Sequence, residues 1–393
     1  MSIIRLNSGT WIRLRRIISC LKGILALICC ILLFSCAGIS GAGTRAEEEP
    51  TPLRIYPARW YKDHAAACSL TFDDGTLDQY AVAAPELDKR GIRGTFFVVT
   101  GFVDRGAWQD GPFLRRLFSW EQARDLAWRG HEVASHTVHH IDLAANPAEA
   151  AEELSRSRER LMDELPWVPA VSLGWPYWRS SEEAVALAEK LYIAARAGGV
   201  KAGPEDWFYG GVNGGSPENI YRIGARGILS SDGEAELRPI LEEVYSRGGW
   251  LIPNFHGVDD GTIDSSALGW EALSLEVFRR ILDSLKEQDI WFAPFGEAAR
   301  YVMQRDALVL ETARAGRVIS VDYSSALDPG IYNQRLTLVV EIGQNFRIKR
   351  VDETETGRPL AFTRQAEGKV VDRYLIDLPP GEGELRILAD PHR

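Results

Sequence analysis

The stretch CSLTFDDGTLDQY, residues 68–80, joins an apolar run to two adjacent carboxylates. The run from Cys68 to Phe72 predicts a short buried strand, and Gly75 closes the loop into which that strand emerges. Asp73 and Asp74 therefore lie at the carboxyl end of the strand, with no basic residue within the stretch. Two like charges in such a position need a compensating group from elsewhere in the chain. The pair therefore indicates a candidate site.

Outward from this stretch, strand-like and helix-like segments alternate along the chain. One helix-like segment, SWEQARDLAWRG, opens with Ser119 and carries Gln122 three residues later, which is a capping-box pattern. Seven or eight such repeats predict an α/β fold with parallel strands, as a barrel or an open sheet, and the length of residues 59–305 favours a (β/α) barrel. The strand-like segments after the first are residues 94–99, 131–136, 170–175, 192–197, 219–225, 250–256 and 290–295.

Residues 306–393 have a different sequence pattern from the residues before them. Short runs of alternating apolar and polar residues, such as GRVISVDYS (316–324) and QRLTLVVEI (334–342), follow one another with turn residues between them. A spacing of about ten residues without helical periodicity is typical of an all-β unit. We therefore expect a small β-sandwich-like accessory domain after the barrel.

The N-terminal residues have the features of an export signal. Basic residues precede the apolar run GILALICCILLF (23–34), which is short for a membrane span. The sequence LLFSC predicts a lipoprotein signal over residues 1–35, with Cys36 lipidated and residues 36–58 as a flexible tether. Cleavage after Ala42, giving a secreted protein without a lipid anchor, is the alternative. Either reading predicts an exported protein that contacts a membrane only through an anchor.

The composition excludes some partners and leaves others open. A formal net charge of −10 argues against nucleic acid as the main partner, because that binding needs clustered lysine and arginine. A neutral saccharide fits this charge. Cys68 is the one cysteine after residue 36, so no disulfide is expected within the mature chain. The oligomeric state stays open.

A second stretch, GHEVASHTVHHID (130–142), gathers four of the seven histidines. His136 and His140 are four residues apart and, like the aspartate pair, follow a predicted strand. The carboxyl ends of barrel strands meet at one mouth, so these imidazoles and one aspartate can form a three-ligand site for a divalent metal. His131 begins its strand and is expected at the opposite rim, while His139 is expected to point away. If one aspartate of the pair binds the cation, the other is free to act as a base beside it.

Four motifs resemble those of the polysaccharide deacetylase family (NodB-homology, carbohydrate esterase 4-like) over about residues 60–300: TFDDG, HTVHH, WPY and NFH. The resemblance implies a deformed (β/α) barrel that removes acetyl groups from sugars, as N-acetyl amides or O-acetyl esters. It implies Asp73 as the catalytic base and His256 as the acid that protonates the leaving group. The backbone N–H of Tyr177 would stabilise the oxyanion. Zinc, or else cobalt, nickel or iron, would be bound by Asp74, His136 and His140.

The chain departs from the family pattern at Gly174, where members usually carry an arginine that orients the base. Arg179 or Arg196 are candidates to supply the guanidinium instead. The tryptophan-bearing fourth motif is hard to place, with Asp206 as a candidate, and Asp259 is a rival for orienting His256. Two tryptophans flank the predicted oxyanion loop and are candidate substrate contacts, namely Trp175 and Trp178.

Three alternatives to a saccharide deacetylase remain. A two-histidine, one-carboxylate iron oxygenase uses the same ligands, but the β/α alternation speaks against it. A catalytically inactive saccharide-binding protein is supported only by Gly174. A non-sugar cyclic amidase on the same barrel is compatible with the metal site. The sequence does not choose a saccharide or decide between amide and ester.

Overall fold

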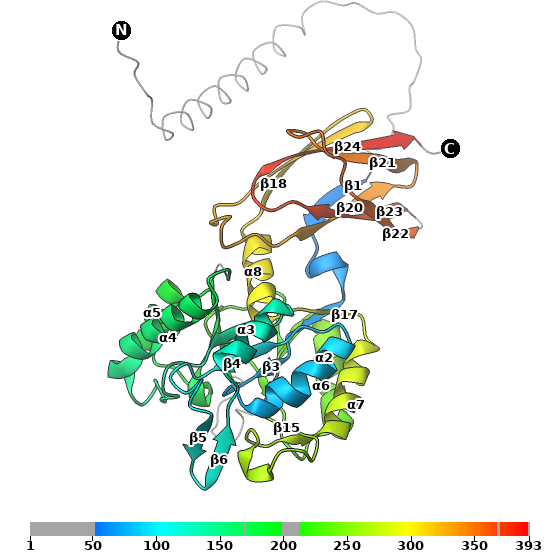
Figure 1. The fold of residues 1–393 in the computed structure, drawn as a ribbon. Coiled ribbons are helices and arrows are strands. Elements are labelled where there is room, and N and C mark those ends of the chain that lie inside the picture. The colour runs from blue at the N-terminus through cyan, green and yellow to red at the C-terminus, as the bar shows by residue number, and fades with distance from the viewer. Residues whose placement is uncertain (1–51, 169, 199–211, 368–369, 392–393) are drawn as a thin grey trace, which may run out of the picture. The chain divides into compact units, whose positions relative to one another are not determined.

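The strand predicted before Asp73 is present as two consecutive buried strands, β2 (Ala66–Cys68) and β3 (Thr71–Phe72), in this computed structural model (Figure 1). The structure describes residues 52–168, 170–198, 212–367 and 370–391. Gly75 follows the aspartate pair with φ of +75°, and a Cβ there would lie 3.2 Å from a methyl group of Val98. Glycine is therefore required where the chain turns tightly against the neighbouring strand.

The sheet that contains β3 is wholly parallel and nearly closes on itself. Its order is β11-β9-β8-β7-β4-β3-β14-β12, and only Ala225 separates the two edge strands in the sequence. The predicted α/β barrel is confirmed. The remaining strands of this sheet are β4 (Thr95–Val98), β7 (Glu132–Ser135), β8 (Leu173–Gly174), β9 (Ala195–Ala197), β11 (Ile223–Gly224), β12 (Arg226–Gly227) and β14 (Pro253–Phe255).

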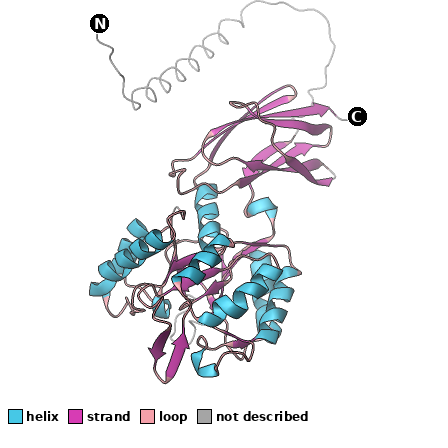
Figure 2. Cartoon of the chain, viewed as in Figure 1, coloured by secondary structure: helices cyan, strands magenta, loops and turns pink. Residues whose placement is uncertain are grey.

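Helices follow the strands and cover the outside of the barrel (Figures 1 and 2). Ser119 caps α3 and forms the expected capping box with Gln122. Between the strands and helices Phe72 stacks on Phe96 and Phe255, with ring centroids 4.9 and 5.3 Å apart. The longer helices are α2 (Ala84–Lys89), α3 (Trp120–Trp128), α4 (Ala150–Glu164), α5 (Glu182–Leu191), α6 (Glu234–Arg247), α7 (Leu275–Lys286) and α8 (Phe295–Asp306).

Short single-turn helical segments precede or continue several of these helices: η1 (Tyr61–Asp63), η2 (Gln79–Ala83), η3 (Pro147–Glu149), η4 (Pro176–Trp178) and η6 (Ser265–Ala267). A second sheet has the order β10-β13-β2-β17, in which β13 and β17 run parallel to β2. Its further strands are β10 (Val212–Asn213), β13 (Trp250–Leu251) and β17 (Ile290–Phe292). Since β2 leads into β3 and β13 into β14, this sheet extends the barrel strands toward their amino ends.

Two small additions that the sequence analysis did not predict lie among the loops that follow barrel strands. The first is an antiparallel hairpin after β4, made of β5 (Ala107–Asp110) and β6 (Phe113–Arg116). The second, after β14, pairs β15 (Val258–Asp259) with β16 (Leu273–Ser274). Both positions place new side chains near the mouth of the barrel.

After α8 the strands form two antiparallel sheets, so the predicted all-β character of the C-terminal part is confirmed (Figure 2). One sheet has the order β1-β20-β23-β22 and the other β18-β19-β24-β21. Their strands are β1 (Leu53–Pro57), β18 (Val309–Ala315), β19 (Val318–Ser324), β20 (Leu336–Gly343), β21 (Phe346–Glu353), β22 (Phe362–Glu367), β23 (Val371–Leu378) and β24 (Gly383–Pro391).

The strand β1 corrects the expected tether. The sequence pattern assigns residues 53–57 to a flexible segment, but they pair antiparallel with β20, from Leu53 opposite Ile342 to Pro57 opposite Leu338. Leu53 and Ile55 pack against the core, which gives this short alternating run a reason to be ordered. The signal, Cys36 and Ala42 lie outside the described residues. Within the described part of the chain, no helix is long and apolar enough to cross a membrane.

Candidate metal centre and active site

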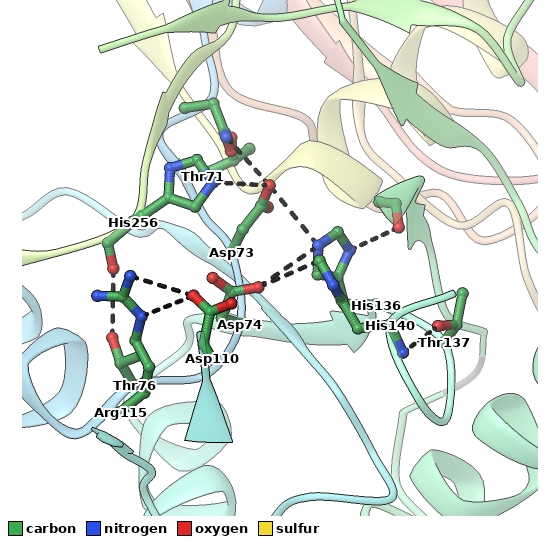
Figure 3. Close-up of polar contacts among 12 residues, drawn as sticks. Thr71, Asp73, Asp74, Thr76, Asp110, Arg115, His136, Thr137, His140 and His256 are labelled. Atoms are coloured by element: carbon green, nitrogen blue, oxygen red, sulfur yellow. Dashed lines mark hydrogen bonds and ion pairs between the residues drawn. The ribbon is translucent and has the colours of Figure 1, made fainter. Parts of the chain in front are cut away.

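The predicted site residues converge at the carboxyl ends of the parallel strands. Asp73 and Asp74 follow β3, His136 and His140 follow β7, and His256 follows β14. They line one cleft of about 500 Å³ (Figure 3). The full lining is Asp73, Asp74, Trp108, Asp110, His136, His140, Asp142, Tyr177, Trp178, Arg179, His256 and Trp270.

Three of these residues are arranged to hold a metal ion. One ligand atom from each of Asp74, His136 and His140 lies within 4.8 Å of the other two. Asp74 Oδ1 is 3.8 Å from His136 Nε2 and 3.5 Å from His140 Nε2 (Figure 3). Burial lowers the pKa of His136 to about 3 and that of His140 to about 4, so both imidazoles are neutral. Neutral imidazole is the form that binds metals.

Hydrogen bonding shows that the three side chains fit a cation. His136 Nδ1 donates to the carbonyl oxygen of Gly174 at 2.7 Å, so its Nε2 presents a lone pair toward Asp74. Asp74 Oδ1 is buried without a hydrogen-bond partner among the described residues. Burial raises the pKa of Asp74 to about 6. Acceptor atoms that face one another in a buried space are stabilised by a bound cation, which also neutralises the carboxylate.

The backbone is strained in the loops that carry the site. A positive φ in a residue other than glycine is uncommon, and such strain clusters at functional sites. The positive φ values place the candidate ligand side chains at sharp turns just beyond the strand ends. In these loops they occur at Asp74 (φ 80°), Thr137 (66°), His140 (57°), Tyr177 (53°) and Trp178 (59°).

Asp73 lies outside the metal trio and is held by two hydrogen bonds. Its Oδ1 accepts from Arg196 Nη2 at 2.5 Å, and its Oδ2 accepts from Asn254 Nδ2 at 3.1 Å. Burial alone would raise the pKa of Asp73, but Arg196, and after it His136 and His256, hold that pKa below its usual range. Asp73 is therefore ionised at neutral pH.

Arg196 supplies the guanidinium that the sequence lacks at Gly174. The two residues lie opposite each other in the register of the parallel strands β8 and β9. A Cβ on Gly174 would lie 2.8 Å from Arg196 Nη2 and 2.9 Å from the Phe97 ring, so glycine leaves the space that Arg196 fills. Arg179, the other candidate, pairs with Asp142 at 2.9 Å. The guanidinium that binds Asp73 therefore comes from β9, the strand next to the one that carries Gly174.

Replacing Arg196 should change the pH dependence of the acetyl hydrolysis that the family resemblance implies. In Arg196→Met, Asp73 keeps its burial but loses the ion pair that most lowers its pKa, so Asp73 should take up a proton at higher pH. The acid limb of the kcat/KM profile should therefore move to higher pH, as measured by acetate release between pH 4 and pH 9. Arg196→Lys, which keeps a charge, is the control and should shift less. An unmoved limb in Arg196→Met would contradict the assignment of Arg196 to Asp73.

His256 lies on the side of Asp73 that faces away from His136 (Figure 3). Its Nε2 is 3.8 Å from Asp73 Oδ2, and burial lowers its pKa. Gln79 Nε2 donates to the backbone carbonyl oxygens of both Asp73 and His256, so one buried amide fixes the two loops together. The His256 Nδ1 atom is buried and has no partner among the described residues.

One of the two aspartates predicted to orient His256, Asp259, does not do so. The Asp259 carboxylate accepts from the N–H of Gly261 at 2.7 Å, and no contact between Asp259 and His256 occurs among the described residues. That expectation is wrong, because β15 carries Asp259 away from the cleft lining. Asp206 lies outside the described residues.

The two tryptophans beside the predicted oxyanion loop have different positions. Trp178 lines the cleft, and so does Tyr177, whose ring centroid is 4.7 Å from that of His140. Trp175 is fully buried, and its indole N–H donates to the Tyr221 carbonyl oxygen at 2.9 Å. The expectation that Trp175 contacts substrate is wrong, because its ring packs into the core.

The two other histidines of the cluster lie where the sequence analysis expects them. His131 Nδ1 accepts from the N–H of Gly94 at the amino end of its strand, and His139 Nδ1 is 2.6 Å from Glu153 Oε1, outside the cleft. The sequence analysis does not single out three residues that line the cleft, namely Trp108, Asp110 and Trp270. The hairpin supplies the first two, and no motif or periodic pattern marks them in the sequence.

Part of the chain matches a known protein family, and individual proteins are similar to it at low sequence identity. The model of the polysaccharide deacetylase family matches residues 61–195. A Bacillus sp. protein named gellan lyase is 26% identical over 353 residues, which is 85% of this chain and 13% of that protein. The chitooligosaccharide deacetylase of a Bradyrhizobium species is 29% identical over 150 residues, which is 37% of this chain and 60% of that protein. The chain thus spans less than two thirds of the length of either relative.

A solved structure of similar type is the Xyl-CE4 domain of a multidomain xylanase from the hindgut metagenome of Trinervitermes trinervoides. The two chains are 16% identical with a TM-score of 0.38, and the match covers 59% of this chain and 89% of the Xyl-CE4 chain.

Proposed function

Residues 61–195 belong to the polysaccharide deacetylase family, and from that premise we propose that this chain is a metal-dependent hydrolase of acetylated saccharides. One observation supports the proposal: Asp74, His136 and His140, which could hold a metal ion, line one cleft with Asp73 and His256. Acetyl transfer to water needs a base, an acid and a stabiliser of negative charge, and this cleft has a candidate for each.

Each side chain has a defined role in the proposal. Asp73, which is ionised, takes a proton from the attacking water. The backbone N–H of Tyr177 donates to the developing oxyanion. His256 gives a proton to the nitrogen or oxygen that leaves as the C–N or C–O bond breaks and acetate forms. Arg196 and Asn254 orient Asp73 by binding one carboxylate oxygen each.

Asp74, His136 and His140 would hold the divalent cation, and we propose zinc because two imidazoles and one carboxylate suit that ion. When bound, the cation polarises the acetyl carbonyl and lowers the pKa of water to about 7. Asp73 is not one of these three residues and would therefore be free to exchange a proton with water.

The competing functions have less support. The inactive saccharide-binding protein is suggested by Gly174 alone, and Arg196 fills that space and binds Asp73. The gellan lyase match covers 13% of that relative, so we do not propose a lyase activity for this chain. A cyclic amidase would use the same metal and base, and the aromatic lining by Trp108, Trp178 and Trp270 favours a sugar ring over a small cyclic amide.

We propose that the hydrolase acts outside the cytoplasm and is anchored through a lipid on Cys36. The basic and apolar pattern before LLFSC supports this location. Fractionation of cells that express the full chain tests it, because an anchored protein sediments with membranes and a secreted one does not.

Acetate release tests the proposed function. The substrate panel pairs N-acetylglucosamine oligomers with an O-acetylated xylan, and the protein used is residues 43–393. Chelator-sensitive acetate from one substrate class supports the metal-dependent hydrolase. Release of no acetate by a protein that binds a metal would contradict a saccharide deacetylase and favour the cyclic amidase.

His256→Ala should slow amide hydrolysis more than hydrolysis of an activated aryl ester. An amine leaves only after protonation, whereas an aryl oxide leaves readily without it, and a positioned acid contributes about 100-fold or more. The expected result is a loss of about 100-fold on an N-acetyl sugar with a much smaller loss on an aryl acetate. Equal losses on both substrates would contradict His256 as the acid.

A further inference from the structure

The β5–β6 hairpin brings a carboxylate into the cleft beside the metal-ligand trio. Asp110 ends β5, and Figure 3 shows it next to Asp74, with His136 and His140 on the other side of Asp74. The two carboxylates are close enough for the charge of Asp110 to help raise the pKa of Asp74, although burial is the largest cause. Asp110 is therefore a neighbour of the reaction centre that no motif includes.

A buried arginine fixes the orientation of Asp110. Arg115 Nε and Nη2 both lie 3.1 Å from the same oxygen, Asp110 Oδ2. Arg115 Nη1 also donates to the backbone carbonyl oxygen of Leu268 at 2.5 Å, which ties the hairpin to the loop that carries Trp270. Arg115 is only 3% exposed, whereas the Asp110 side chain is 43% exposed. Because Arg115 binds only Oδ2, the second oxygen of Asp110 is left facing the cleft that this residue lines.

That second oxygen, Asp110 Oδ1, differs from the other carboxylate oxygens of the cleft. Both oxygens of Asp73 are engaged, by Arg196 and Asn254. Both oxygens of Asp142 are also engaged, one by the N–H groups of residues 144 and 145 and the other by Arg179. Asp74 belongs to the metal trio. Asp110 Oδ1 has no hydrogen-bond partner among the described residues, so it is available to a substrate.

An N-acetyl amide and an O-acetyl ester present the same carbonyl group and differ at the leaving atom. The amide nitrogen carries a hydrogen and is a donor, while the ester oxygen is not. His256 must itself donate a proton to the leaving atom, so a separate acceptor is needed for the amide N–H. A site built around such an acceptor discriminates against a substrate that lacks the donor.

We propose that Asp110 Oδ1 accepts the N–H of an acetamido sugar, so that the enzyme acts on N-acetyl amides in preference to O-acetyl esters. This inference rests on the proposed function and names its substrate class. Arg115 acts as the positioning residue, because it binds Oδ2 and directs Oδ1 toward the cleft.

Asp110→Asn tests the proposal with little change in size. Arg115 can only donate, so the asparagine carbonyl oxygen should face Arg115 and its NH₂ group should face the cleft. A donor would then meet the amide N–H. We expect kcat/KM for an N-acetylglucosamine disaccharide to fall by about 10- to 100-fold, since a hydrogen bond to a charged group is replaced by a mismatch. For the matched disaccharide with 2-O-acetyl groups we expect a change within about threefold.

Asp142→Asn is the matched control, because Asp142 lines the same cleft but has both oxygens engaged within the protein. It should change hydrolysis of the two disaccharides by the same factor. Metal content and thermal unfolding of each variant establish that the fold and the metal trio are intact.

The outcomes separate this inference from the proposed function. Selective loss on the amide in Asp110→Asn, with parallel changes in Asp142→Asn, supports Asp110 as the amide acceptor. Equal losses on amide and ester in Asp110→Asn, or a wild type that prefers the ester, overturn the inference while the hydrolase stands. A wild type that releases acetate from neither disaccharide overturns both.

Discussion

Asp74→Asn is expected to lose bound metal and acetate release together. The substitution removes the one anionic ligand of the trio, and the two remaining imidazoles are neutral because burial lowers their pKa values. A neutral amide oxygen is a much weaker ligand for a divalent cation than a carboxylate. Elemental analysis of the purified variant should therefore find less than a stoichiometric amount of metal, and hydrolysis should fall to the uncatalysed background. His136→Ala should behave in the same way.

The HTVHH segment offers a matched control for the histidine. His139 lies three residues from His136, but its Nδ1 contacts Glu153 and its side chain is half exposed outside the cleft. His139→Ala should keep its metal and its activity. If His136→Ala kept a full equivalent of metal, or if His139→Ala lost it, the assigned ligand set would be wrong.

Asp73→Asn is expected to retain metal but lose turnover. The side chain lies outside the trio, so removal of its charge leaves the three ligands in place. An amide cannot take a proton from water, and a positioned general base contributes about 100- to 10,000-fold. We therefore expect kcat to fall by about that factor with KM changed much less. Steady-state kinetics together with metal analysis of the same preparation measure both quantities.

The contacts of Asp73 sharpen this prediction. Asn254 donates to Asp73 Oδ2 and Arg196 to Oδ1, and an asparagine at position 73 can satisfy only one of these donors. Some loss of thermal stability is expected in addition to the loss of turnover. A stable Asp73→Asn protein with near wild-type kcat would refute Asp73 as the base.

Much of the site could be predicted because its residues follow the strands directly. The barrel brings the carboxyl ends of β3, β7 and β14 to one mouth, so side chains within a few residues of those ends must meet there. That rule and the four motifs are enough to group Asp73, Asp74, His136, His140 and His256 from the sequence alone. The barrel itself could be predicted because strands that alternate with helices along a sequence form a parallel sheet or barrel.

What could not be predicted depends on the register between strands and on loops without periodicity. Arg196 reaches Asp73 because it lies opposite Gly174 in the β8–β9 pairing, and a single sequence does not give that register. Asp110 belongs to a four-residue strand of the β5–β6 hairpin, too short to show alternation. Trp175 adjoins the cleft in sequence, but the direction of its ring into the core is set by packing.

Return of metal to stripped protein tests the central claim most directly. Wild-type protein freed of metal with a chelator would be titrated with zinc while acetate release from N-acetylglucosamine oligomers is measured. The account predicts no release without metal, an increase with each addition, and saturation at one ion per chain. Full activity in the stripped protein, or one bound ion per chain without any acetate release, would contradict it.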